Sequence, residues 1–296
     1  MVRSIHLLFL FPAFALAEPS VSFRAQIAPL LHRRCAACHN EDSAKGRYRL
    51  DSLVRLWKTG ESELPPLVAG RPKESELFLR LVETSADDRM PQKADALPAD
   101  EIALIERWIH EGAVSDGGDP GRPIVELARE SLLRSAPERY PHPQPVSALA
   151  FSPDGAQLAV SGYFEITIWD VASGALVRRI GGMPERIAAL AWHPRRNVIA
   201  VAGGVPSQWG GVALVDANAG FQTKYLCDMP ESALSVAFSP DGSQLAAGGG
   251  DRTVRFFDVM SGKQTRVLKQ HADWVQTVAF SPDGMLLVAE IGRAHV

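Results

Sequence analysis

Cysteine is scarce in this chain, and its few copies exclude a disulfide framework. The 296 residues contain 3 cysteines, Cys35, Cys38 and Cys227. Cys35 and Cys38 are separated by two residues in a motif described below, which leaves Cys227 without a partner. We therefore expect no structural disulfide, and we expect Cys227 to be a small buried apolar residue.

Long apolar runs and an excess of one charge are also missing. Beyond the N-terminal segment, no apolar stretch has the length needed to cross a bilayer as a helix. The formal net charge of -3 indicates neither nucleic acid nor an anionic membrane as a partner. The second half of the chain carries no Ser/His/Asp arrangement, phosphate-binding loop or carboxylate pair typical of hydrolysis. We expect no membrane span in the mature chain and no nucleic-acid partner.

The N-terminal segment has the three parts of a secretory signal peptide. Arg3 supplies a positive charge, residues 7–16 are apolar, and Ala15-Leu16-Ala17 is a small-x-small cleavage site. An uncleaved anchor is the alternative, but the apolar run is short for a stable membrane helix. We interpret residues 1–17 as a signal peptide, and we expect a periplasmic or otherwise exported protein.

Cys35-Ala36-Ala37-Cys38-His39 is a Cys-x-x-Cys-His motif, the attachment signature of a c-type haem. Cysteines three positions apart lie on the same side of a helical turn, where each thiol can form a thioether bond to a haem vinyl group. The histidine that follows is then held beneath the iron as its proximal ligand. A redox dithiol or half of a zinc site is the alternative, but a second cysteine pair and a strand feeding a thioredoxin-like turn are both missing. We therefore expect Cys35 and Cys38 to bind one haem c covalently, and His39 to bind its iron.

Helical patterns flank this motif on both sides. Apolar residues recur at helical spacing over residues 21–34, directly before the motif, at Phe23, Ile27, Leu30 and Leu31. Residues 100–111 show a second such pattern, with Pro98 before its start and Gly112 after its end. A helix, the haem motif, loops and a terminal helix fit a small all-α cytochrome c domain over residues 18–116.

The segment from Ser22 to Ala113 resembles the planctomycete-type cytochrome c domain. The match rests on several stretches: Ile27-Ala28-Pro29-Leu30-Leu31 before the haem motif, Gly46 to Ser52, Ala69-Gly70-Arg71-Pro72 with Ser75-Glu76-Leu77, Met90-Pro91, and Trp108 to Ala113. The resemblance implies single-electron transfer by a covalently held haem.

Met90 is our candidate for the sixth iron ligand. It is the only methionine between Met1 and Met183, and a thioether is a weak neutral ligand that favours Fe(II) and raises the potential. A lone methionine is more often a packing residue, but the haem motif and the family resemblance favour ligation. His32 and His110 are rival ligands. The first is too close to the motif to reach the other face of the haem, and the second is near a helix end.

Basic residues outnumber acidic ones around the motif. The acidic residues of this stretch are Glu41, Asp42 and Asp51. The basic residues are Arg33, Arg34, Lys45, Arg47, Arg49, Arg55 and Lys58. We interpret them as partners of a haem propionate or as a surface that steers an acidic redox partner. A solvated surface with no further role is the alternative. We expect Trp57, in the same stretch, to be a core residue.

From residue 146 onward the chain repeats. Its anchors are Phe151, Trp192, Phe238 and Phe280, at spacings of 41, 46 and 42 residues, a period typical of propeller blades. Ser-Pro-Asp-Gly follows three of them, a hairpin turn in which Pro fixes φ and Gly tolerates a positive φ. In the first unit the pattern predicts strands over residues 146–151, 157–161, 165–170 and 175–180. The long second spacing predicts an inserted loop over residues 203–211.

The units resemble WD repeats. Ile168-Trp169-Asp170 matches the strand-end signature, while His142 and His271 stand where the family places a structural histidine, and Asp251 stands in the turn that such a histidine contacts. Residues 146–289 hold about three and a half units, fewer than a closed propeller needs, so we expect an incomplete propeller. Residues 117–145 are interpreted as a linker with a short helix. Residues 291–296 can be back-translated to a sequence like a sequencing adapter, and we expect the segment 290–296 to be non-biological.

The combined expectation is a multidomain protein, a small all-α cytochrome c domain followed by an all-β WD-repeat propeller. We expect an electron carrier rather than an enzyme, with redox proteins as partners and the propeller as a protein-docking surface. Two alternatives stay open. One is a haem enzyme or sensor whose distal ligand is displaced, and the other is a WD-repeat scaffold whose haem is structural.

Overall fold

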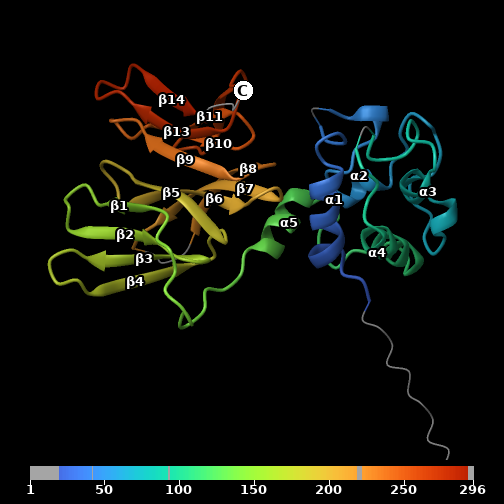
Figure 1. Cartoon of the computed structure of the whole chain (residues 1–296), viewed down its shortest axis with the longest axis horizontal. Coiled ribbons are helices and arrows are strands. Elements are labelled where there is room, and N and C mark those ends of the chain that lie inside the picture. The colour runs from blue at the N-terminus through green and yellow to red at the C-terminus, as the bar shows by residue number, and fades with distance from the viewer. Residues whose placement is uncertain (1–19, 42, 93, 219–221, 293–296) are drawn as a thin grey trace, which may run out of the picture.

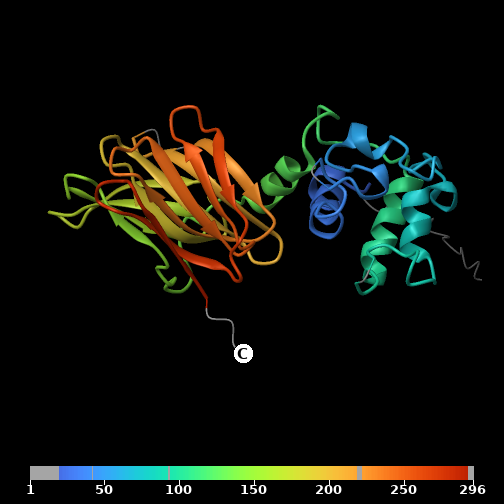
Figure 2. The same ribbon diagram turned by 90° about the horizontal axis from the view of Figure 1, so that it is seen from above.

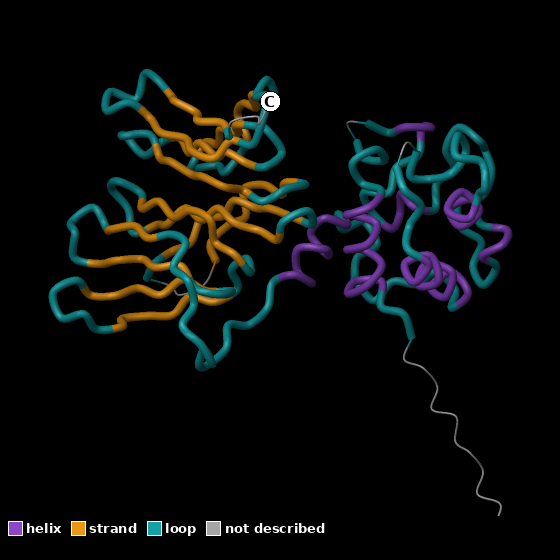
Figure 3. Tube along the Cα trace, viewed as in Figure 1, coloured by secondary structure: helices purple, strands orange, loops and turns teal. Residues whose placement is uncertain are grey.

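The computed structural model describes residues 20–41, 43–92, 94–218 and 222–292, and the rest are drawn in grey in Figure 1. The predicted signal peptide at 1–17 lies outside these ranges, and so do residues 293–296 of the C-terminal segment. A helical region comes first and antiparallel sheets follow it, which confirms the predicted fold class (Figure 3). Within the described ranges, no helix combines the length and the apolar character that a membrane crossing requires.

Short helices make up the first region: η1 (Phe23–Ile27), α1 (Ala28–Arg34), η2 (Lys45–Arg47), α2 (Leu53–Leu56), η3 (Pro72–Glu74), α3 (Glu76–Val82), α4 (Ala99–His110) and α5 (Ile124–Leu132). The helix predicted over residues 21–34 is present as a π-helical turn, η1, that continues directly into α1. The Ser22 side chain caps its start, because Oγ accepts a hydrogen bond from Ala25 N at 2.9 Å.

The helical core forms where the first helix meets α4. Phe23 stacks on Trp108 with ring centroids 5.4 Å apart, and both side chains are buried. Trp108 Nε1 donates to Val114 O at 2.9 Å, which satisfies the indole N–H away from water. The prediction for Trp57 is wrong, since its side chain is 40% exposed. It follows the single turn of α2, in which Leu56 occupies the buried position.

Helix α5 packs on the same core, although it lies in the segment interpreted as a linker. Its Ile124 and Leu127 side chains are buried in the helical cluster. The start of α5 is tied to the chain after the haem motif, because Ile124 N donates to Asp51 O at 2.8 Å. Residues 133–145 then form an irregular connection to the sheets (Figure 2).

Antiparallel strands follow in chain order: β1 (Leu149–Phe151), β2 (Gln157–Ser161), β3 (Glu165–Asp170), β4 (Leu176–Gly181), β5 (Arg186–Trp192), β6 (Val198–Val205), β7 (Trp209–Asp216), β8 (Gln222–Met229), β9 (Ala233–Phe238), β10 (Gln244–Gly249), β11 (Val254–Asp258), β12 (Gln264–Leu268), β13 (Val275–Phe280) and β14 (Leu287–Ile291). They form three four-stranded sheets, β1–β4, β5–β8 and β9–β12, and a two-stranded sheet, β13–β14. The sheets succeed one another as an arc in Figure 1, with their first strands adjacent. Closure into a ring is not detected among the described strands.

The Ser-Pro-Asp-Gly turns between first and second strands share one hydrogen-bond pattern. In the β9–β10 turn, Ser239 Oγ donates to Asp241 Oδ1 at 2.6 Å, and the same oxygen accepts from Ser243 N at 3.0 Å. Gly242 adopts a φ of 78°, which a side chain would oppose. The predicted turn chemistry is therefore present.

The degraded second copy of the turn uses a histidine in place of the serine. His193 Nδ1 accepts hydrogen bonds from the backbone N–H groups of Arg195 and Arg196, each at 3.0 Å. Burial, and then the neighbouring Arg196, lower the pKa of His193 and so favour the neutral ring that can accept at Nδ1. This turn therefore keeps its shape with different atoms.

In the third sheet, Asp251 makes contacts other than the histidine contact that the resemblance to WD repeats predicts. Asp251 accepts from Thr253 Oγ1 and from Arg255 Nη2, each at 2.7 Å. Met229 precedes the anchor Phe238 by nine residues, the spacing at which His271 precedes Phe280, and it is buried. Asp251 is thus held within its own turn by residues of the next strand.

The prediction of an inserted loop over residues 203–211 is wrong. The extra residues lengthen β6 and β7, which stay paired up to Val205 opposite Trp209. Glycine-rich sequence is typical of loops, but here the missing side chain lets backbone segments pass closely. At Gly210, a Cβ atom would collide with the backbone oxygen of Glu231.

Candidate functional site

Helix α1 ends where the Cys-x-x-Cys-His motif begins. Cys35 caps α1, and its N–H donates to Leu31 O at 2.9 Å. The carbonyl of Cys35 then accepts from Cys38 N at 3.1 Å and from His39 N at 3.2 Å. The backbone therefore gathers both thiols and the imidazole into one turn at the helix end.

The imidazole of His39 is oriented by a backbone carbonyl. His39 Nδ1 lies 3.2 Å from Tyr48 O. Because a carbonyl oxygen can only accept, Nδ1 must carry the proton, and the lone pair of the neutral ring then resides on Nε2. The carbonyl thus fixes the tautomer and the ring orientation, as a hydrogen-bond partner does for a histidine that binds a metal ion.

Tyr48 is held firmly enough to serve as that anchor. Its hydroxyl donates to Leu56 O at 2.9 Å, and its ring meets His39 edge-on with centroids 5.7 Å apart. Burial raises the pKa of Tyr48 above its usual value, so the hydroxyl stays protonated. Sequence reasoning missed this role, although Tyr48 lies inside the matched stretch from Gly46 to Ser52.

The pKa of the Cys35 thiol is raised, which does not suit a redox-active dithiol. Burial, and then the negative charge of Glu101, raise its pKa to about 12. Redox-active Cys-x-x-Cys pairs depend instead on a lowered thiol pKa. Among the described residues, no group of three or more His, Cys, Asp or Glu side chains is placed to hold a metal ion.

Met90 lies against the helical core that also receives the haem motif. Its half-buried side chain packs on the cluster that Cys35 and Ala36 contact. Its backbone N–H donates to Arg80 O at 2.8 Å, which ties the loop to α3. A neutral thioether is thus available beside the core, in a loop far from the motif in sequence.

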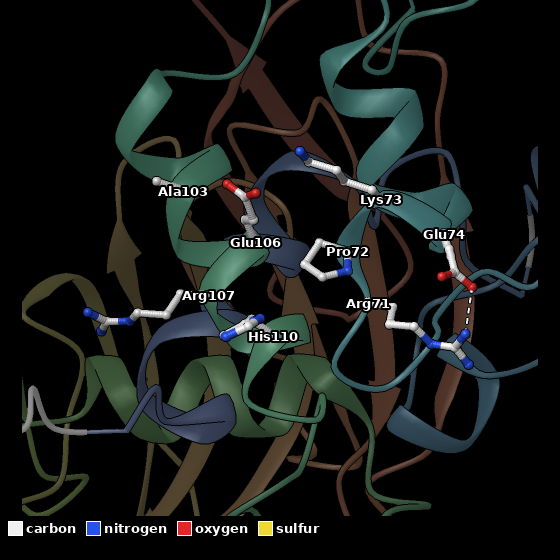
Figure 4. A pocket seen from close by; sticks show the side chains of 8 residues that line it. All are labelled: Arg71, Pro72, Lys73, Glu74, Ala103, Glu106, Arg107 and His110. Atoms are coloured by element: carbon white, nitrogen blue, oxygen red, sulfur yellow. Dashed lines mark ion pairs between the residues drawn. The ribbon is translucent and has the colours of Figure 1, made fainter.

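The two rival histidines lie in other surroundings. His32, on α1, is half-buried and lies within electrostatic range of Asp228 in β8; burial lowers its pKa. His110, at the end of α4, lines a surface hollow of about 490 Å³ between η3 and α4 (Figure 4). This hollow carries side chains of both charges, and Arg71 on its rim already pairs with Glu74 at 2.9 Å.

Three of the seven basic residues predicted to form a patch make close ion pairs with carboxylates. Arg33 and Arg34 both bind Glu101 of α4, at 2.8 Å and 2.9 Å. Arg49 pairs with Asp51. The local count of charges missed Glu101, because it lies more than sixty residues away in the sequence.

Arg89 offers a donor that sequence reasoning overlooked. Its Nε atom is buried and has no hydrogen-bond partner among the described residues, and it immediately precedes Met90. A buried guanidinium N–H without an acceptor suits an anionic group such as a haem propionate. Together with the thiols, the oriented imidazole and the thioether, it gives a donor set that fits a haem.

Comparison with known families divides the chain in the same way. The family described as Planctomycete cytochrome C matches residues 35–93. The WD domain, G-beta repeat, matches residues 137–170, 228–258 and 262–289. These WD segments do not cover most of β5–β8, although that sheet has the same four-stranded order.

Two curated relatives match part of the chain. Periodic tryptophan protein 2 homolog of Mus musculus is 27% identical over 121 residues, covering 40% of this chain and 13% of the mouse protein. WD repeat-containing protein VIP3 of Arabidopsis thaliana is 31% identical over 149 residues, covering 46% of each. The chain therefore spans less than half the length of either relative. The two family matches, taken together, identify residues 35–93 as a Planctomycete cytochrome C domain that is followed by WD40 repeats.

Proposed function

We propose that the protein is an exported c-type cytochrome that carries single electrons. The observation that carries this proposal is the hydrogen bond from His39 Nδ1 to Tyr48 O, in a turn that also holds Cys35 and Cys38. It leaves Nε2 as a ligand atom beside two thiols. Membership of residues 35–93 in a cytochrome c family supports the same reading.

Each residue of the site has a distinct task. Bound haem supplies one-electron chemistry between Fe(III) and Fe(II). Cys35 and Cys38 would anchor it through thioether bonds, and His39 and Met90 would bind its iron. The buried cluster around them would exclude water and raise the reduction potential.

Two protein ligands argue for a carrier rather than a catalyst. With His39 and Met90 both bound, no coordination position is open for a substrate. The rest of the protein would then control only the potential and access to partners. Redox proteins are the expected partners, and the WD40 repeats, a family that suggests protein interactions, would provide the docking module.

The proposed location follows from the leader sequence. Residues 1–17 have the pattern of a cleaved signal peptide, and covalent haem attachment at Cys-x-x-Cys-His takes place outside the bacterial cytoplasm. We therefore place the mature protein in the periplasm or in another exported compartment.

The test is a pyridine haemochrome spectrum with intact mass of protein matured in an export-competent host. We expect one haem per chain, held covalently. Cys35→Ala combined with Cys38→Ala should lose it, whereas Cys227→Ala should retain it. Colourless wild-type protein without the added mass would overturn the proposal. A high-spin ferric spectrum of the holoprotein would instead favour a haem enzyme or sensor.

A second measurement separates the carrier from a scaffold with a structural haem. The holoprotein should exchange electrons with a soluble redox mediator at its midpoint potential. Absence of measurable exchange, together with unchanged partner binding in the double cysteine variant, would favour the scaffold.

A further inference from the structure

A partly buried ion pair joins the helical region to the sheets. Arg129 of α5 donates through Nη1 to both carboxylate oxygens of Asp228 in β8, at 2.9 Å and 2.7 Å. The two side chains are only 15% and 16% exposed. Screening by solvent is therefore weaker here than at the surface ion pairs of the same chain.

Aromatic side chains of the second sheet complete the contact. The Arg129 guanidinium carbon lies 4.3 Å from the centre of the Tyr225 ring, a cation–π contact. On its other side, Asp228 Oδ1 accepts from Trp209 Nε1 at 2.7 Å. Trp209 is fully buried and meets Tyr225 edge-on at 6.0 Å. The Trp209 indole, which belongs to the same sheet as Asp228, therefore orients the carboxylate that binds Arg129.

The second sheet is specialised for this contact. Trp209 stands in the lengthened β6–β7 hairpin, the extra residues that give the second unit its longer spacing. A Cβ atom at Gly211 would lie 2.5 Å from the Trp209 ring, so the indole needs this glycine. Counted back from the next anchor, the position of Asp228 is Gly182 in the first unit and Gln270 in the third. A carboxylate stands there in the second unit alone.

The junction also reaches the helix that carries the haem motif. His32 of α1 is half-buried and lies within electrostatic range of Asp228. It precedes Cys35 by about one helical turn. Helices α1 and α5 pack against each other. A displacement of α5 at Arg129 would therefore also displace α1, the helix that ends at the haem motif.

We propose that this junction is a latch that fixes the cytochrome domain in one orientation on β8 of the WD repeats. The two parts then behave as one body instead of two domains on a flexible tether. A partner docked on the repeats would find the haem at a constant position. The latch does not depend on the haem, and it holds whether or not electron transfer is the function.

The test uses the full-length holoprotein with Arg129→Ala and Asp228→Asn. Trypsin cleavage at Arg134 and Arg139, in the connection of residues 133–145, reports opening of the junction. Because cleavage follows the population of the open form, we expect it to accelerate about tenfold or more in both variants. The maximum dimension from small-angle X-ray scattering should increase as well. Arg122→Ala is the matched control, since it removes the ion pairs of Arg122, just before α5, with Glu126 and Glu130 of α5. It removes no ion pair to the described residues of β8.

Further variants separate a latch from simple loss of stability. Arg129→Ala with Asp228→Asn should cleave no faster than either single variant, because both remove one interaction. Arg129→Lys should be intermediate, since it keeps the charge but loses the planar group over Tyr225. The haemochrome and far-ultraviolet dichroism should match wild type throughout. Wild-type cleavage and dimensions in both single variants would overturn the proposal, and so would equal acceleration by Arg122→Ala.

Discussion

The imidazole of His39 depends on a residue that lies outside the haem motif. The carbonyl of Tyr48 accepts the Nδ1 proton, and the Tyr48 hydroxyl is in turn fixed by Leu56 O. Such outer contacts set the basicity and the angle of a ligand and not merely its presence. The loop between the motif and α2 is therefore part of the candidate site.

Replacement of the thioether gives the sharpest test of the axial pair. Met90→Ala should retain covalent haem but lose the weak band near ~695 nm that reports Met ligation. Its potential should fall by on the order of 0.1 V, within the ~0.8 V range that axial ligands set. The measurements are an optical spectrum and a redox titration. Met260→Ala is the control, because this methionine is 82% exposed on a sheet turn. An unchanged band in Met90→Ala would assign the sixth position elsewhere.

An acid titration tests the turn chemistry of a single carboxylate. The Ser239 hydroxyl, followed by the N–H and hydroxyl groups of Ser243, lowers the pKa of Asp241 from 3.8 to about 2. The folded state therefore prefers the ionised form. This stabilisation is complete above pH 3.8 and is lost as the pH falls toward about 2.

Carbon NMR of the Asp241 carboxyl group measures this midpoint directly. In Ser239→Ala we expect the midpoint to move up toward 3.8, because the largest contribution is removed. Ser173→Ala, in a turn of the first sheet, should leave it in place. A Ser239→Ala midpoint equal to that of wild type would contradict the assignment.

At the scale of elements, an aromatic stack holds η1, at the start of the helical region, against α4. Phe23 of η1 and Trp108 of α4 are more than eighty residues apart, and they meet at 5.4 Å. Glu101 reinforces the same pairing through Arg33 and Arg34. Helices this short gain little from their own hydrogen bonds, so this tertiary packing has to supply their stability.

Removal of the Trp108 indole should therefore strongly destabilise the helical region. Trp108→Ala is expected to lower the free energy of unfolding of the helical region by about 3–5 kcal/mol. Urea unfolding followed by the helical dichroism signal measures it. The matched control is Trp57→Ala, where a side chain that is 40% exposed should cost less than about 1 kcal/mol. Equal losses in the two variants would show that the stack is not the main contact.

Periodic sequence predicted the elements well, and tertiary contacts poorly. Strands β2 and β3 match their predicted ranges, and α4 differs from its predicted range by one residue at each end. The glycines of residues 203–211 led to the wrong prediction of a loop. They allow close packing of backbone segments, which no local sequence pattern reveals. The roles of Tyr48, Arg89 and Glu101 were likewise invisible, since each depends on which distant atoms surround the side chain. The identities of the thiols, the imidazole and the thioether came from spacing and resemblance, and they stay predictions.

At the scale of the whole molecule, the arc of sheets leaves apolar side chains exposed on its outermost strands. Leu149 and Phe151 on β1 are 57% and 55% exposed, and Val288 on β14 is 67% exposed. Among the described strands, each of these is paired on one side only, β1 with β2 and β14 with β13. An edge strand that carries exposed apolar side chains favours pairing with another chain. The chain as given in the sequence should therefore self-associate.

A charge on the outermost strand should reduce this association. Val288→Lys is expected to lower the weight-average mass in analytical ultracentrifugation relative to wild type, because an edge lysine opposes strand pairing. Met260→Lys adds the same charge at an exposed turn and should have little effect. Wild-type association in Val288→Lys, or equal loss in both, would rule out this edge as the contact.

The packing of α5 sets where the helical region can be cut out for separate study. Ending the polypeptide at Asp116 would discard Ile124 and Leu127, which are 1% and 2% exposed, and would leave their apolar counterparts facing water. A stand-alone fragment should therefore run through Leu132, at the last residue of that helix. Shortened versions that stop earlier are expected to precipitate or to mature with little pigment, whatever their redox chemistry.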